Sequence, residues 1–116
     1  MMLLQGPFRT ANVAVILSAL LHIVAPVAGG FEASTFGMVP IGLFFLALAY
    51  GLSRGWRGLA YLTFLIMGFG ISAAISGAYS ISPIPSWLFG AIGAADAAAM
   101  VLLFVALWRD PAPKGA

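Results

Sequence analysis

Two titratable side chains lie deep inside apolar stretches of this sequence, and their types suit proton transfer or ligand binding. His22, the only histidine, belongs to an apolar run over Ala11–Gly29, and Asp96 belongs to another over Trp87–Trp108. A charge in a hydrocarbon interior costs at least about 2.5 kcal/mol, so such groups are normally paired. We therefore predict that His22 and Asp96 are neighbours, joined by a direct hydrogen bond or through one water molecule.

The spacing from the nearest arginines supports this pairing. His22 follows Arg9 by 13 residues, and Asp96 precedes Arg109 by the same number. At a helical rise of about 1.5 Å per residue, each side chain lies about 20 Å from its arginine along the helix. If both arginines mark one membrane surface, His22 and Asp96 have similar depths.

Two further residues shape the surroundings of His22. Pro26 has no N–H, so the carbonyl of His22, four residues earlier, loses its helical partner and the helix is expected to kink there. Ser18 precedes His22 by one turn and lies on the same helix face, where its hydroxyl is expected to hydrogen-bond the ring or the backbone. Together with Ala14, these residues form a small, polar stripe that we expect to point inward.

The predicted pair has two interpretations: a proton-binding or ligand-binding site between the first and last runs, or a polar contact that fixes which helices are neighbours. No metal site is predicted, because one histidine and one aspartate fall short of the ligands that zinc needs. The absence of cysteine excludes thiolate ligands and disulfides. No catalytic residue and no cofactor is predicted. A quinone, or a pigment held by His22, is compatible with these residues, but nothing else in the sequence indicates one.

The composition indicates a membrane environment. Hydrophobic residues make up 63% of the 116 residues and charged residues only 7%, whereas soluble domains carry roughly 25% charged residues. A small soluble domain exposes too much surface to hide so many apolar side chains. The sequence therefore predicts an all-α, polytopic membrane protein, a single domain over residues 1–116 with the lipid bilayer as its partner. The five basic residues form no patch, which argues against nucleic acid binding.

Clusters of glycine and proline divide the chain into four apolar spans. These are expected at Ala11–Gly29, Met38–Leu52, Leu59–Ala78 and Trp87–Trp108. The last span is about 31 Å long, close to one hydrocarbon thickness, and Ser86 is its expected N-cap. The first run also resembles a secretory leader, but three further spans favour a retained helix. We expect four transmembrane helices in an antiparallel bundle.

All basic residues fall on one side of these four spans: Arg9, Arg54, Arg57, Arg109 and Lys114. Because basic residues are enriched in cytoplasmic segments, both termini are expected in the cytoplasm, with the protein in a bacterial inner (plasma) membrane.

Small residues predict which spans approach most closely. The third and fourth spans each have two sets of small side chains at helical spacing, so these two spans are expected to pack together. The residues concerned are Gly70, Ala74 and Ala78, then Gly68, Ser72 and Ser76 in the third span, and Gly90, Ala94 and Ala98, then Gly93 with Ala97, in the fourth. The second span carries the bulky run Leu43–Leu46 and is expected to face lipid. Asn12 is expected to meet water or lipid headgroups.

Part of the chain resembles DoxX-like small membrane proteins. The stretches Gly42–Arg54 and Arg57–Tyr61 are similar to their second span, basic turn and third span. The His22-to-Pro26 ending of the first span is similar to that of some members. The resemblance implies a four-helix bundle and a link to membrane redox enzymes, and it assigns no catalytic residue.

Three functions are compatible with the sequence. The first is a non-enzymatic accessory or assembly subunit of a larger membrane complex, whose partners are other membrane subunits or further copies of the chain. The second is a small proton-coupled transporter or channel that works as an oligomer, with His22 and Asp96 as coupling groups. The third is a quinone-linked redox component, which rests on the DoxX-like resemblance.

Overall fold

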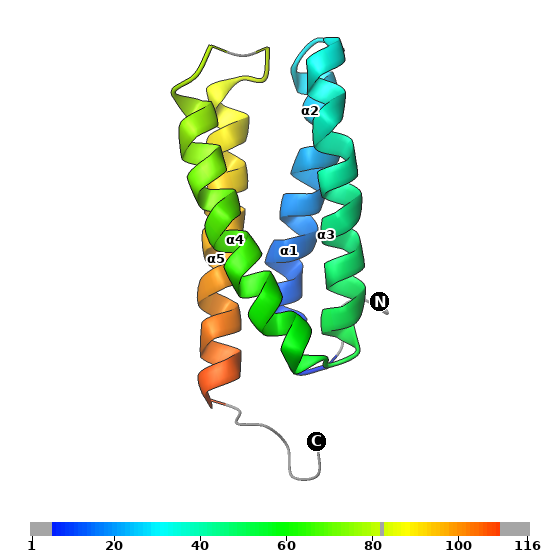
Figure 1. Ribbon diagram of the computed structural model, residues 1–116, viewed down its shortest axis with the longest axis vertical. Coiled ribbons are helices and arrows are strands. Elements are labelled where there is room, and N and C mark those ends of the chain that lie inside the picture. Colours follow the sequence, from blue (N-terminus) through cyan, green and yellow to red (C-terminus); the bar gives the residue numbers. More distant parts are fainter. Residues whose placement is uncertain (1–5, 82, 110–116) are drawn as a thin grey trace.

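The computed structural model describes residues 6–81 and 83–109, apart from the side chains of Ser34 and Arg109. Helices dominate this part of the chain, and it contains no strand (Figure 1). The α-helices are α1 (Arg9–Ile23), α2 (Ala25–Ala28), α3 (Met38–Ser53), α4 (Arg57–Ala78) and α5 (Ser86–Arg109), and the 3-10 helix η2 (Ala33–Gly37) leads into α3. The all-α prediction is confirmed, and α3, α4 and α5 agree closely with the predicted spans, whereas α1 ends at Ile23, before the predicted end at Gly29.

Three of the helices are long and apolar enough to cross a membrane. They cover Thr35–Ser53, Arg57–Ala78 and Ser86–Trp108. The first of them includes the last residues of η2, which lengthen α3 toward the roughly 20 residues that a crossing needs. Helix α1 has 15 residues and is shorter than that. By length and composition the chain is therefore a membrane protein with three candidate spans.

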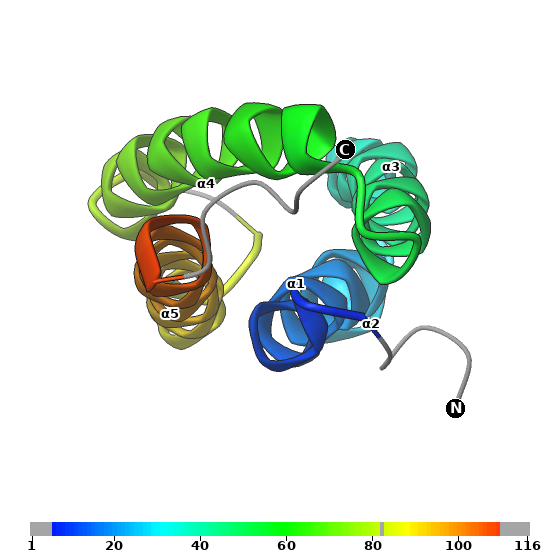
Figure 2. The same ribbon diagram turned by 90° about the horizontal axis from the view of Figure 1, so that it is seen from below.

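The long helices form two pairs, which contact each other through α1 and α5. α1 packs against α3, α4 packs against α5, and α1 also contacts α5 along much of its length. α3 and α4 touch near the short turn that joins them and then diverge (Figures 1 and 2). The start of α1, the α3–α4 turn and the end of α5 all lie at one end of the molecule (Figure 1). At that end the Arg57 side chain donates a hydrogen bond to the carbonyl of Leu107 at 3.2 Å.

The helix that carries His22 is interrupted ahead of Pro26, as predicted. α1 ends at Ile23, Val24 lies between the two helices, and Pro26 occupies the first turn of α2, where its missing N–H costs nothing. α2 ends in a Schellman motif: Gly30, with a φ of +71°, and Phe31 donate to the carbonyls of Val27 and Pro26 at 3.3 and 2.7 Å. Helix α1 therefore ends one residue after His22.

Small residues allow the closest helix contacts. A Cβ on Gly42 in α3 would lie 2.7 Å from the carbonyl oxygen of Ala19 in α1. Between α4 and α5, a Cβ on Gly93 would lie 3.4 Å from that of Ala74. The predicted close contact of the last two spans is thus confirmed on the Gly70–Ala74 face. It is wrong for a second set of small residues, which are exposed: Ser72, Ser76, Gly90, Ala94 and Ala98.

Three side-chain predictions are wrong. Asn12 is fully buried and donates from Nδ2 to the carbonyl of Ala49 at 2.8 Å, so it joins α1 to α3. Phe45 is buried, while its neighbours Leu43 and Phe44 are exposed as expected. Ser86 is the first residue of α5, and its hydroxyl donates to the carbonyl of Ala78 at 2.9 Å, which ties the loop to the end of α4.

Candidate functional site

The polar residues predicted to form a site come together where α1 crosses α5. Ser18 and His22 lie one turn apart on α1, and Asp96 projects from α5. The Ser18 hydroxyl donates a hydrogen bond to Oδ1 of Asp96. Ser18 and Asp96 are fully buried and His22 is 6% exposed. The three residues therefore form one buried polar cluster between two helices that are far apart in the sequence.

The ring of His22 is fixed by its own helix. Its Nδ1 lies 2.7 Å from the carbonyl oxygen of Ser18. A carbonyl oxygen only accepts hydrogen bonds, so Nδ1 must carry the hydrogen. In the neutral ring Nε2 is then an acceptor with a free lone pair. Among residues 6–81 and 83–109, the bond at Nδ1 is the hydrogen bond that the ring makes, and Nε2 has no partner there.

Ser18, rather than a direct bond, connects the predicted pair. Its hydroxyl contacts Asp96 and its carbonyl contacts His22. Asp96 therefore aligns with Ser18, one turn nearer Arg9 than the sequence spacing predicts. The reason is that α5 extends further than α1 at the arginine end (Figure 1), so equal counts from the two arginines do not give equal depths. The expected bond from the Ser18 hydroxyl to the ring or backbone is wrong, because that hydroxyl is used by Asp96.

Helix α3 forms a wall against His22. The rings of His22 and Phe45 meet edge to face, with centroids 4.9 Å apart and planes at 63°. A Cβ on Gly42 would lie 3.2 Å from the Cβ of His22, so only glycine leaves α3 this close to α1. The His22 ring is thus fixed by its hydrogen bond within α1 and by its contact with Phe45 of α3.

Helix α4 closes over the carboxyl group of Asp96. Oδ2 of Asp96 is buried without a hydrogen-bond partner in the part of the chain that the structure describes. Oδ2 lies directly against Gly70, where an added Cβ would overlap it. Gly70 is therefore the residue that gives the carboxyl group its space.

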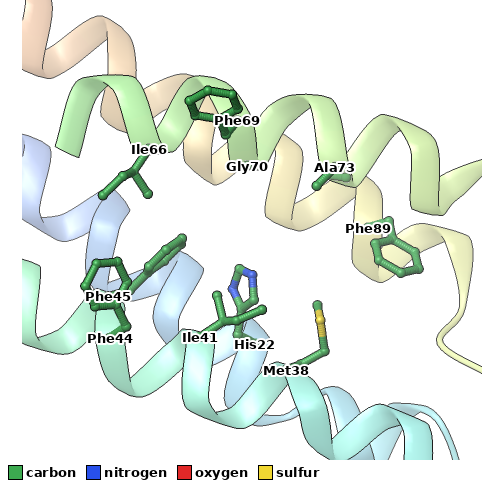
Figure 3. Close-up of a pocket in the computed structure, with 11 residues that line it drawn as sticks. His22, Met38, Ile41, Phe44, Phe45, Ile66, Phe69, Gly70, Ala73 and Phe89 are labelled. Atoms are coloured by element: carbon green, nitrogen blue, oxygen red, sulfur yellow. The ribbon is translucent and has the colours of Figure 1, made fainter. Parts of the chain in front are cut away.

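An apolar pocket of about 350 Å³ adjoins this cluster between α3 and α4. Figure 3 shows the His22 ring reaching into it from α1, with Phe44 and Phe45 on one side and Phe69 and Gly70 on the other. The pocket arises because α3 and α4 diverge from their common turn. Among the described residues, His22 is the only titratable one in the lining, and the others are apolar: Met38, Ile41, Phe44, Phe45, Ile66, Phe69, Gly70, Ala73, Ala74 and Phe89.

Sequence reasoning identified the polar residues but missed the residues that position them. Gly42, Phe45 and Gly70 each contact His22 or Asp96. The spacing of Gly42, Phe45, Ala49 and Leu52, all buried, marks one face of α3 and was the available signal. Within the described residues, no group of three or more histidine, cysteine, aspartate or glutamate side chains is placed to hold a metal ion.

The fold and this cluster define the class of protein: a small, all-helical membrane protein with a buried Ser–His–Asp cluster beside an apolar pocket. Comparison with protein-family models, curated proteins and solved structures finds no match for the chain. The DoxX-like resemblance therefore stays a prediction from the sequence.

Proposed function

We propose that this chain is an integral membrane protein that binds an apolar small molecule from the lipid phase in the pocket beside His22. The pocket itself carries the proposal. Small-molecule sites are concave, mostly apolar and about 300–1,000 Å³ in volume, with a few polar groups that orient the ligand. This pocket has that size, apolar walls and a single titratable residue.

The position of the pocket suits entry from the side. Ile41, Phe44 and Phe69 line the pocket and are themselves exposed on the outside of the helices. In a membrane that outside is lipid, so a molecule dissolved in the acyl chains reaches His22 without crossing a polar layer. The proposed role is binding or carriage rather than catalysis.

Photolabelling tests this proposal. The probe is an alkylbenzene with a diazirine on its chain, added to protein in lipid nanodiscs, and labelled residues are located by mass spectrometry. We expect saturable labelling at the pocket lining. Ala73→Trp, which places an indole at the lining, should abolish it, whereas Ala47→Trp, an exposed α3 position outside the pocket, should not. Labelling spread evenly over all lipid-facing residues, or unaffected by Ala73→Trp, would reject the binding role.

We also propose that α1 and α2 together form a fourth span and that both termini are cytoplasmic. The support is the position of Arg9, Arg54, Arg57 and Arg109 at helix ends that share one end of the molecule (Figure 1), together with the enrichment of basic residues on the cytoplasmic side. Lys114, the fifth basic residue, lies outside the described residues.

Reporter fusions check this topology. A cytoplasmic reporter should be active when it is fused after Ala116 or inserted near Gly55, and an exported reporter should be active near Ser34. Activity of an exported reporter at Ala116 would contradict the four-span arrangement.

An accessory or assembly subunit is the second candidate function, and the outer face of α4 favours it. This helix is the least buried of the three long apolar ones, and it exposes large side chains along its length, among them Tyr61, Leu65, Phe69 and Ile75. Purification in mild detergent separates the candidates. Stoichiometric recovery with a larger complex supports the accessory role, a homo-oligomer supports a proton-coupled transporter or channel, and a bound quinone or chromophore supports a redox component.

A further inference from the structure

We propose that the pocket selects uncharged, lipid-soluble molecules that carry a hydroxyl group, which donates a hydrogen bond to Nε2 of His22. This inference rests on the proposed binding function and names the chemical class of its ligand. The inference follows from the two ring nitrogens of His22: Nδ1 already makes a hydrogen bond, and Nε2 is left for a ligand.

The hydrogen bond inside α1 sets the polarity of the site. Nδ1 is committed as a donor to the Ser18 carbonyl at 2.7 Å, so the neutral ring offers only an acceptor to the pocket. Nε2 is the ring nitrogen on the far side from that carbonyl, and the ring reaches into the pocket from α1 (Figure 3). A ligand that complements it must bring a donor, such as an alcohol, a phenol or an enol.

The apolar lining argues for an uncharged ligand. His22 is more than nine-tenths buried, and the other lining residues carry no charged side chain. A charged group in these surroundings would lose its hydration without gaining a partner of opposite sign on the pocket wall. A hydroxyl group provides the one donor that Nε2 needs and places no charge in the pocket.

Neither a lipid acyl chain nor a water molecule suits Nε2 of His22 as well as a ligand hydroxyl group does. An acyl chain fills the volume and excludes water but offers Nε2 no hydrogen-bond partner, which is costly. A water molecule needs two to four polar partners to be held, and this lining offers it the His22 ring as its only polar side chain. A molecule with an apolar body and one hydroxyl group matches both the walls and the nitrogen.

A matched pair of competitors tests the donor requirement. 4-Nonylphenol and 4-nonylanisole share the ring and chain, but only the phenol can donate a hydrogen bond. We expect the phenol to displace the diazirine probe at about tenfold lower concentration than the anisole. A tenfold ratio corresponds to about 1.4 kcal/mol, the upper range for one neutral hydrogen bond. In His22→Phe, which keeps a planar ring and removes Nε2, the two competitors should act equally.

Nitrogen NMR provides a second readout that needs no variant. His22 is the only histidine, so labelling with ¹⁵N-histidine reports this ring alone. We expect Nδ1 to be protonated before and after the phenol is added, and the Nε2 resonance to shift on binding of the phenol but not of the anisole. Equal competition by phenol and anisole in the unchanged protein, no competition by either, or a proton on Nε2 in the free protein would each overturn the donor requirement. Equal competition by the phenol and the anisole would reject the donor requirement but not the binding pocket. Failure of the photolabelling would reject the binding pocket itself.

Discussion

Gly42→Ala is expected to lower the free energy of unfolding by about 1–3 kcal/mol, the usual cost of an extra carbon in a closely packed contact. The new Cβ would lie 2.7 Å from both the carbonyl oxygen of Ala19 and a side-chain carbon of Ile23. A backbone carbonyl inside a helix cannot move aside alone, so α1 and α3 must separate. Because His22 lies at the same crossing, the separation also loosens its contact with Phe45.

Gly90→Ala is the matched control for this variant. Gly90 also lies inside a long helix, and a Cβ there would meet nothing within 4 Å. Alanine favours a helix over glycine, so Gly90→Ala should leave stability unchanged or raise it slightly. Unfolding in mixed detergent micelles, followed by circular dichroism, gives both values. Equal stability of the two variants would show that α1 and α3 are not in backbone contact at Gly42.

The positions of the helices could be predicted from the sequence because each depends on local information. Long apolar runs separated by glycine and proline determine where a helix begins and ends, and the bounds of α3, α4 and α5 agree closely with the predicted spans. The interruption before Pro26 follows in the same way from one missing N–H group. These features need no knowledge of neighbouring helices.

The contacts of the site could be predicted only in part, because they depend on the register between helices. Counting from Arg9 and Arg109 placed Asp96 opposite His22, but the relative lengths of α1 and α5 place it opposite Ser18. Asn12 was expected at the surface because it lies near a span end. It shares the buried face of α1 with Val15 and Ser18, which helical periodicity alone could have indicated.

Gly70→Ala should disrupt the polar cluster directly. The added Cβ would overlap Oδ2 of Asp96, and the carboxyl group cannot rotate away without losing the hydrogen bond from Ser18. We expect stability to fall by about 1–3 kcal/mol from overpacking. Gly68→Ala is the matched control on the same helix, because its nearest neighbour is the flexible end of Met100 at 3.3 Å.

A second substitution distinguishes this cause from a general defect in helix packing. Asp96→Ala removes the atom that the new methyl group would strike, so Gly70→Ala combined with Asp96→Ala should be clearly more stable than the sum of the two single effects predicts. Residues in contact commonly show such couplings of about 0.5–3 kcal/mol. The same cycle with Gly68→Ala in place of Gly70→Ala should be additive within about 0.5 kcal/mol. Additivity in the Gly70 cycle would mean that Gly70 does not give the carboxyl group its space, and the contact between Gly70 and Oδ2 of Asp96 would have to be abandoned.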